Sequence, residues 1–425
     1  MVNRTKNHWS TGHSERRSAV LAVVNARILT VSAGVIPSGA VLVDDAGRIA
    51  AVGERIDVPE GTEMIDAGGR TLTPGLVDGF SRLGLINEGL GWAGSDADES
   101  TDPNTAHVRA LDGLYPFDRG IAEAHTGGVT TVHVVPGGSN VLAGQALAIK
   151  LRRAVAADDL VLRHPTGVAA GLGERPKAAY GGEKRMPATR MGVAAVLREA
   201  LVKAQEYDPE KERDLRCEAL LPVLRGELPL LVEAHRADDI VTALRIGREF
   251  GIRITLLGAT EGHLVADLIA EAGAAVAAGP SLAARGRQET RDVGLHLPLA
   301  LHRHGVPTAI VTGHPQLDQP YLNVAAALAV REGLTPEEAL RAVTLTPAEI
   351  LGVADRVGSI APGRDADLVL WDGDPLELTT RVAWTMVEGR VVYMDDDRGG
   401  AHGGWGHDGR EGPGPGRPCG EVNGR

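Results

Sequence analysis

The sequence predicts an α/β protein organised around a closed eight-stranded barrel of the (β/α)8 type. From Leu76 onward, short apolar stretches alternate with stretches of helical periodicity, which is typical of parallel strands covered by helices. The number of these units favours a closed barrel over an open sheet. A barrel takes roughly 250 residues, so a chain of 425 residues leaves room for a smaller second unit. The apolar stretches lie at 130–138, 167–173, 228–235, 252–258, 274–279 and 307–313.

The two ends of the chain have a different texture from the middle. Residues 19–73 read as short strands separated by Gly, Asp and Pro turns, with Asp-Ala-Gly-Arg at 45–48 as a hairpin signal, and they predict a small β layer. Residues 357–395 return to the same β texture. The polar segment 1–18 and the Gly-, Pro- and Arg-rich segment 396–425 are expected to be disordered.

Several helix boundaries are marked by specific residues. The segment ADDIVTALRIGREFG predicts an amphipathic helix that ends at Gly251. Thr335 and Thr346 are each followed by Pro and, three residues on, by Glu. This pattern predicts two N-capped helices with a capping box.

Composition excludes several classes of function. The formal net charge is −12 and the pI is near 5.6, so neither nucleic acid nor an anionic membrane is expected as a partner. No run of 18 apolar residues is present, and the two cysteines lie too far apart for a disulfide framework or a zinc finger. A cytoplasmic protein is expected.

The first barrel strand carries an unusual pair of residues at its C-terminal end. Phe80 and Arg82 are two apart in TPGLVDGFSRLGL, so their side chains point to the same face of the strand. Phenylalanine has no lone pair, and a guanidinium is a permanent cation without an acceptor. The pair therefore disfavours a metal ion and favours an anion.

The segment TPGLVD, together with GERPKAAYG and GRDADLVLWDGDP, resembles the amidohydrolase superfamily in its imidazolonepropionase-like branch. The resemblance implies a barrel over 74–356 and a composite β-sandwich built from 19–73 and 357–395. It also implies a metal-dependent hydrolase that acts on non-peptide C–N bonds, in particular those of cyclic amides.

Position by position, however, the resemblance implies that the metal ligands are replaced. Phe80 and Arg82 stand where the family has a histidine pair, and Glu233 and Gly258 stand at the two later histidine positions. Gly313 replaces the aspartate that serves as ligand and general base. Of the family's ligand positions, only one used by some members matches, at Glu174.

Two functions are therefore weighed. The favoured one is a non-catalytic relative without a metal cofactor that binds a small anion through Arg82, with His263 and His314 as further ligand-binding candidates. Such a protein would act as a homo-oligomer or together with an active relative.

The alternative is an active amidohydrolase whose site is rebuilt around Glu174, Glu233 and His235 and holds zinc or another divalent metal. An Arg82–carboxylate ion pair is favoured over this metal site because it balances charge without an ion. Restoring the family residues at all five replaced positions is expected to restore metal uptake.

Overall fold

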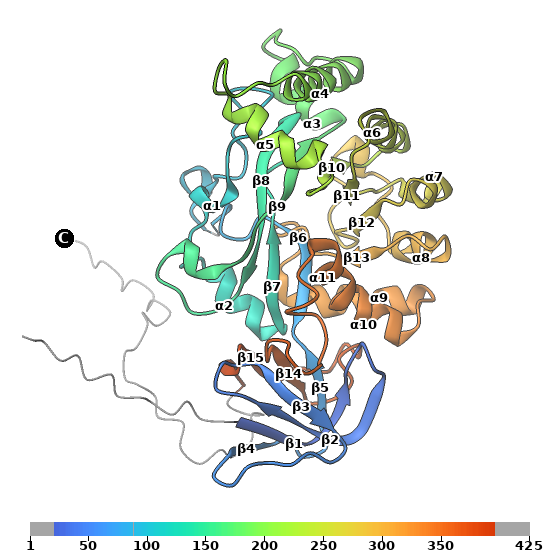
Figure 1. Ribbon diagram of the computed structural model, residues 1–425. Coiled ribbons are helices and arrows are strands. Elements are labelled where there is room, and N and C mark those ends of the chain that lie inside the picture. Colours follow the sequence, from blue (N-terminus) through green and yellow to red (C-terminus); the bar gives the residue numbers. More distant parts are fainter. Residues whose placement is uncertain (1–20, 88, 396–425) are drawn as a thin grey trace, which may run out of the picture.

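The computed structural model describes residues 21–87 and 89–395, which form two eight-stranded sheets (Figure 1). The first sheet has the order β16-β15-β14-β5-β1-β2-β3, with β4 paired to β1, so both chain ends contribute to it as expected. Its strands are β1 (Leu21–Leu29), β2 (Val35–Val43), β3 (Ile49–Gly53), β4 (Glu63–Asp66), β5 (Thr71–Pro74), β14 (Leu368–Trp371), β15 (Val382–Val387) and β16 (Arg390–Met394).

The second sheet is the barrel, in which the strands follow one another from β6 to β13. They are β6 (Leu76–Ser81), β7 (Val129–Val134), β8 (Leu142–Lys150), β9 (Val161–Gly171), β10 (Leu230–Ala234), β11 (Ile254–Gly258), β12 (Ala275–Ala278) and β13 (Thr308–Ile310). The predicted barrel is confirmed, with one difference. Strand β8 runs antiparallel to both of its neighbours, because β7, β8 and β9 follow one another without the α-helices that would make each crossover parallel.

Two backbone hydrogen bonds close the barrel beyond the last residue of β13. The Gly313 amide donates to the Phe80 carbonyl at 3.1 Å, and the Arg82 amide donates to the His314 carbonyl at 3.0 Å. The first barrel strand and the segment after the last one are therefore neighbours, as a closed barrel requires.

Helices surround the barrel, and those on one side form the layer seen at the right of Figure 1. They are α1 (Ala110–Gly113), α2 (Arg119–Thr126), α3 (Glu174–Gly181), α4 (Arg190–Gln205), α5 (Leu215–Leu224), α6 (Ala237–Phe250), α7 (Ala266–Glu271), α8 (His296–Arg303), α9 (Leu322–Glu332), α10 (Pro336–Ala342) and α11 (Leu345–Leu351). None of the helices in the described part of the chain combines the length and the apolar run that crossing a bilayer demands.

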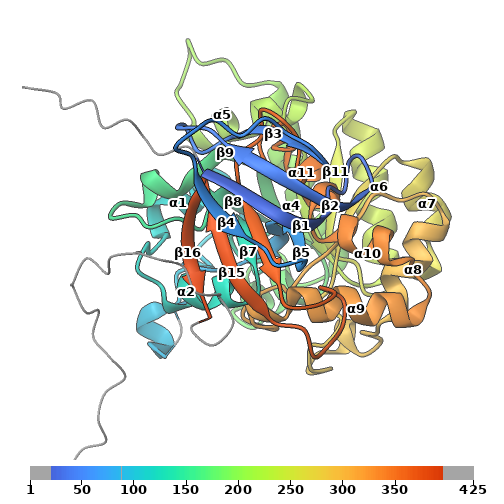
Figure 2. The same ribbon diagram turned by 90° about the horizontal axis from the view of Figure 1, so that it is seen from below.

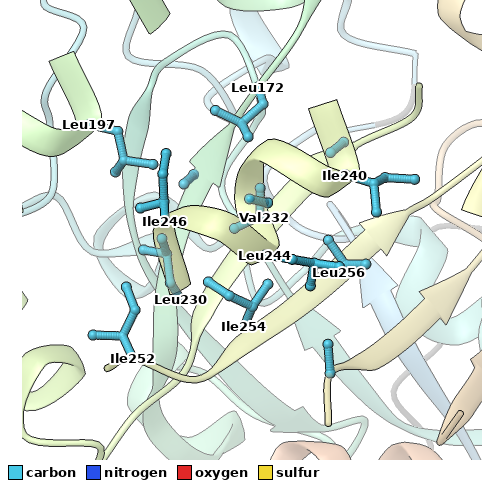
Figure 3. Packing of buried hydrophobic residues seen from close by; sticks show 14 of the residues in the cluster. Leu172, Leu197, Leu230, Val232, Ile240, Leu244, Ile246, Ile252, Ile254 and Leu256 are labelled. Carbon is cyan, nitrogen blue, oxygen red and sulfur yellow. The ribbon is translucent and has the colours of Figure 1, made fainter. Parts of the chain in front are cut away.

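Strand alternation decides which side chains face the helices and which face the barrel interior. Leu230 and Val232 of β10 pack with Leu244 of α6 in the outer core (Figure 3). The residue between them, Leu231, belongs instead to an inner cluster that also contains Phe80. Because alternate residues of a strand share a face, Glu233 lies on the same side as Leu231, facing the interior.

The predicted end of α6 and the predicted N-cap and capping box of α10 are confirmed, and the predicted N-cap of α11 is not. Helix α6 ends at Gly251, which adopts the left-handed conformation with φ of 65°. Thr335 caps α10, and Glu338 completes its capping box. The capping role predicted for Thr346 is wrong, because α11 begins at Leu345 with Thr344 at the N-cap position, two residues before the predicted N-cap.

A buried lysine joins the two sheets at the base of the barrel, where the composite sheet lies beneath the barrel strands in Figure 1 and in front of them in Figure 2, which is seen from below. Lys150 ends β8, and its Nζ donates to Asp365 Oδ2 at 2.6 Å and to Asp367 Oδ2 at 2.7 Å. All three side chains are almost completely buried. Lys150 thus bridges two carboxylates that the C-terminal segment places under the barrel, and Arg356 binds one of them, Asp365, as a second cation.

Candidate functional site

The C-terminal ends of the barrel strands bring Arg82 and Glu233 together. Arg82 follows β6 and Glu233 lies near the end of β10, and Arg82 Nη2 donates to Glu233 Oε2 at 2.7 Å. The two side chains are only 3% and 8% exposed. The Arg82 guanidinium also lies 5.2 Å from the centre of the Phe80 ring, a cation–π contact. Arg82, which is predicted to disfavour a metal ion, therefore forms a buried ion pair with Glu233, and Phe80 packs against its guanidinium.

A second arginine binds the same carboxylate. Arg175, in the first turn of α3, donates from Nη1 to Glu233 Oε1 at 3.1 Å and from Nη2 to Asp98 Oδ2 at 3.0 Å. Burial alone would raise the pKa of Glu233, but the guanidinium groups of Arg175 and Arg82 hold it well below its usual range. Glu233 is consequently a fixed anion with both oxygens engaged.

The loop after β7 reaches this carboxylate because it contains glycine. A Cβ atom on Gly138 would lie 2.4 Å from Glu233 Oε2, which is too close for any other residue. The Pro-Gly-Gly sequence that ends the second predicted strand therefore has a packing role beside Glu233.

His235 is held from both ring nitrogens. Its Nδ1 lies 2.9 Å from Thr260 Oγ1, and Arg287 Nη2 lies 3.3 Å from its Nε2. A guanidinium can only donate, so Nε2 accepts in its contact with Arg287. His235 thus supports Arg287, and the same nitrogen lies 3.6 Å from Glu233 Oε1.

These residues line a cavity of about 420 Å³ at the end of the barrel. Its charged side chains are Arg82, Arg175, Arg287 and Glu233, so cations outnumber anions in its wall. The chemical balance of the cavity therefore favours an anionic ligand.

Two of the replaced positions have no room for a larger side chain. Gly258, at the end of β11, has φ of 83°, and a Cβ there would lie 2.5 Å from His235 Cε1. Gly313, after β13, has φ of 56°, and a Cβ there would lie 2.8 Å from Pro280 Cδ. The His235 ring occupies the space that a histidine at position 258 would need.

The other predicted site residues, Glu174, His263 and His314, are not among those that line the cavity. Glu174 begins α3, and its Oε1 stands 3.7 Å from Arg287 Nη1 without a hydrogen bond. His263 is not among the residues that line the cavity; it contacts His296, with ring centres 4.5 Å apart. His314 is buried beside Arg82 and also outside the cavity lining, and burial lowers the pKa of its imidazole.

The residues present do not fit a metal ion at the family position. Of the five replaced positions, only Glu233 offers a side-chain donor atom suited to a metal, and both of its oxygens accept hydrogen bonds from guanidinium groups. Across residues 21–87 and 89–395, no three His, Cys, Asp or Glu side chains come together in a group that could hold a metal.

Sequence reasoning missed Arg175, Arg287 and Thr260. Arg175 stands directly after Glu174 in the GERPK motif, so its place next to a strand end was a usable signal. Arg287 lies in an irregular segment before a short 3₁₀-helix (Gln288–Thr290), where no periodicity marks it.

Comparisons with known proteins agree with this architecture. The model of the amidohydrolase family matches residues 252–395. The imidazolonepropionase of Cupriavidus necator is 30% identical over 414 residues, covering 83% of this chain and 90% of that enzyme. Amidohydrolase tasK of Hapsidospora irregularis is 29% identical over 378 residues; the match covers 80% of this chain but only 38% of that longer protein.

Among solved structures, the crystal structure of an amidohydrolase from Thermotoga maritima MSB8 is 38% identical, with a TM-score of 0.85. The superposition covers 88% of this chain and all of that one. With this coverage and identity, the chain belongs to the amidohydrolase family, in its imidazolonepropionase-like branch.

Proposed function

We propose that the end of the barrel is a binding pocket for a small organic anion and that this chain does not hydrolyse C–N bonds. The observation that carries the proposal is the Arg82–Glu233–Arg175 network, which stands where the family places metal ligands. Arg287 adds a third guanidinium to the same cavity.

The network is poorly suited to hydrolysis. Attack on an amide needs an activated water, an electrophile for the carbonyl oxygen and a proton carrier. The low pKa of Glu233 makes it a weak base, and both of its oxygens already accept hydrogen bonds. Gly313 stands where the family has the aspartate that would carry the proton.

The alternative, an active hydrolase rebuilt around Glu174, Glu233 and His235, has less support. Glu233 Oε1 and His235 Nε2 are 3.6 Å apart, but that nitrogen accepts from Arg287. Arg287 also stands beside Glu174, so a guanidinium occupies the space among the three groups that a metal would need. Curated relatives are named as enzymes, which keeps hydrolysis as the competing outcome of the test.

The test combines ligand binding with turnover. The purified chain is titrated with small carboxylates and with their neutral amides, and it is assayed with cyclic amides in the presence of zinc or manganese. We expect carboxylates to raise the melting temperature, amides to leave it unchanged, and no hydrolysis. Hydrolysis that is abolished by Glu233→Gln would contradict the proposal, as would a melting temperature that no carboxylate changes.

A further inference from the structure

Arg287 is the cation of the cavity that lacks a bonded carboxylate. Its Nη2 lies 3.3 Å from His235 Nε2, and its Nη1 has no hydrogen-bond partner within the described parts of the chain. Its Nη1 lies 3.7 Å from Glu174 Oε1, an ion pair without a hydrogen bond. Arg82 contributes a second unpaired donor, because its Nε is buried and has no partner there either.

The other two guanidinium groups are already compensated. Arg82 and Arg175 both bind Glu233, and Arg175 also binds Asp98, so two cations are matched by two carboxylates. The third, Arg287, faces only Glu174, at 3.7 Å and without a hydrogen bond between the two groups. A ligand carboxylate could supply the hydrogen bonds that Glu174 does not make, whereas a dianion would bring an excess negative charge into a partly buried site.

The rest of the cavity wall is mostly apolar. Phe80, Pro280, Ala283, Ala284 and Val293 line it, and the additional polar side chains include Thr260 and Gln316. Its volume of about 420 Å³ is near the lower end of the range for small-molecule sites, roughly 300–1,000 Å³. These walls suit a compact apolar body more than a hydrated polyanion.

The loop that carries Arg287 is held in place by an ion pair between the buried Glu289 and Arg190. Glu289, two residues on and 2% exposed, accepts a hydrogen bond from Arg190, which also binds Asp239 at the start of α6. Together with the contact to His235, this anchor holds the guanidinium over the cavity before any ligand arrives, which lowers the ordering cost of binding.

We infer that the ligand is a small monocarboxylate with a compact apolar body, and that its carboxylate binds to Arg287 with Arg82 Nε as a second donor. This inference rests on the proposed anion-binding function and specifies the ligand class. It assigns the specificity of the pocket to Arg287, a residue outside the positions that the family uses for metal.

The experiment is calorimetric titration of the full chain with benzoate, benzamide, succinate and inorganic phosphate at constant ionic strength. Benzoate and benzamide have nearly the same shape and differ in charge. A hydrogen bond to a charged group corresponds to about a tenfold or greater difference in affinity. We expect benzoate to bind about tenfold more tightly than benzamide, and more tightly than succinate or phosphate.

Arg287→Ala should weaken benzoate binding by about tenfold or more, to the level of benzamide, and leave benzamide binding unchanged. Arg291→Ala, which removes an exposed arginine paired with Asp292, is the matched control and should change nothing. Tighter binding of succinate or phosphate would overturn the ligand class while leaving an anion pocket. Full benzoate affinity in Arg287→Ala would overturn the role of Arg287, and the absence of binding by every anion would overturn the proposed function as well.

Discussion

The buried ion pair between Arg82 and Glu233 should show strong thermodynamic coupling. Glu233→Leu would leave the Arg82 guanidinium, 3% exposed, without a carboxylate, and breaking a buried pair in this way costs about 3–5 kcal/mol. Arg82→Leu should cost less, about 2–3 kcal/mol, because Arg175 still binds Glu233. In the double variant no charge of the pair is left unbalanced, and Arg175 keeps Asp98 as a partner. Its stability should lie close to that of the wild type.

Urea denaturation of the four proteins, followed by circular dichroism at neutral pH, measures the coupling as a double-mutant cycle. The expected interaction energy is several kcal/mol in favour of the pair. Each protein is measured with a chelator and with added zinc, and the values should not differ, since the pair needs no ion. Single variants that each lose less than about 1 kcal/mol, or losses that simply add in the double variant, would refute the reasoning.

Three further predictions concern the buried Asp78, the buried Lys150 and the five replaced metal-ligand positions. Burial raises the pKa of Asp78 from 3.8 to about 6. The contribution of its protonated form to the free energy of unfolding is therefore fully present below pH 3.8, where the unfolded chain is protonated too, and is lost as pH rises through 6. The unfolding free energy of Asp78→Asn, measured relative to that of the wild type, should therefore increase by up to about 3 kcal/mol from acidic to neutral pH. A difference between the two proteins that is constant with pH would contradict this. Lys150→Met should destabilise by about 3–5 kcal/mol, because the buried Asp367 loses its cation while Asp365 keeps Arg356; an unchanged urea midpoint would contradict it. Restoring histidine or aspartate at all five replaced positions should not restore metal uptake, contrary to the expectation from sequence, because His235 fills the space beside Gly258; elemental analysis showing one bound metal ion in that variant would contradict this.

The barrel could be predicted because its signals are periodic and local. Strand β10 reads as a buried apolar run, and α6 shows one apolar face and a glycine at its end. The antiparallel strand β8 was not anticipated, because its direction depends on the length of the connections around it and not on its own residues. Likewise, Thr346 carries a complete capping pattern, but the N-cap of α11 is Thr344, two residues earlier.

The site was predictable only where it lies on strands. The two-residue spacing placed Phe80 and Arg82 on one face, and the expected contact between Arg82 and a carboxylate is present, with Glu233. The contributions of Arg175 and Arg287 could not be predicted, since they come from a helix start and from an irregular segment. Their positions depend on tertiary contacts, including those of Arg287 with His235 and of Glu289 with Arg190.

The metal content of the purified protein tests the central claim most directly. The chain is loaded with zinc or manganese, freed of excess ion by gel filtration, and analysed by elemental mass spectrometry. Because guanidinium groups engage both oxygens of Glu233, we predict that far less than one metal ion per chain is retained. One tightly held ion per chain, lost when Glu233 is changed to Ala, would contradict the account.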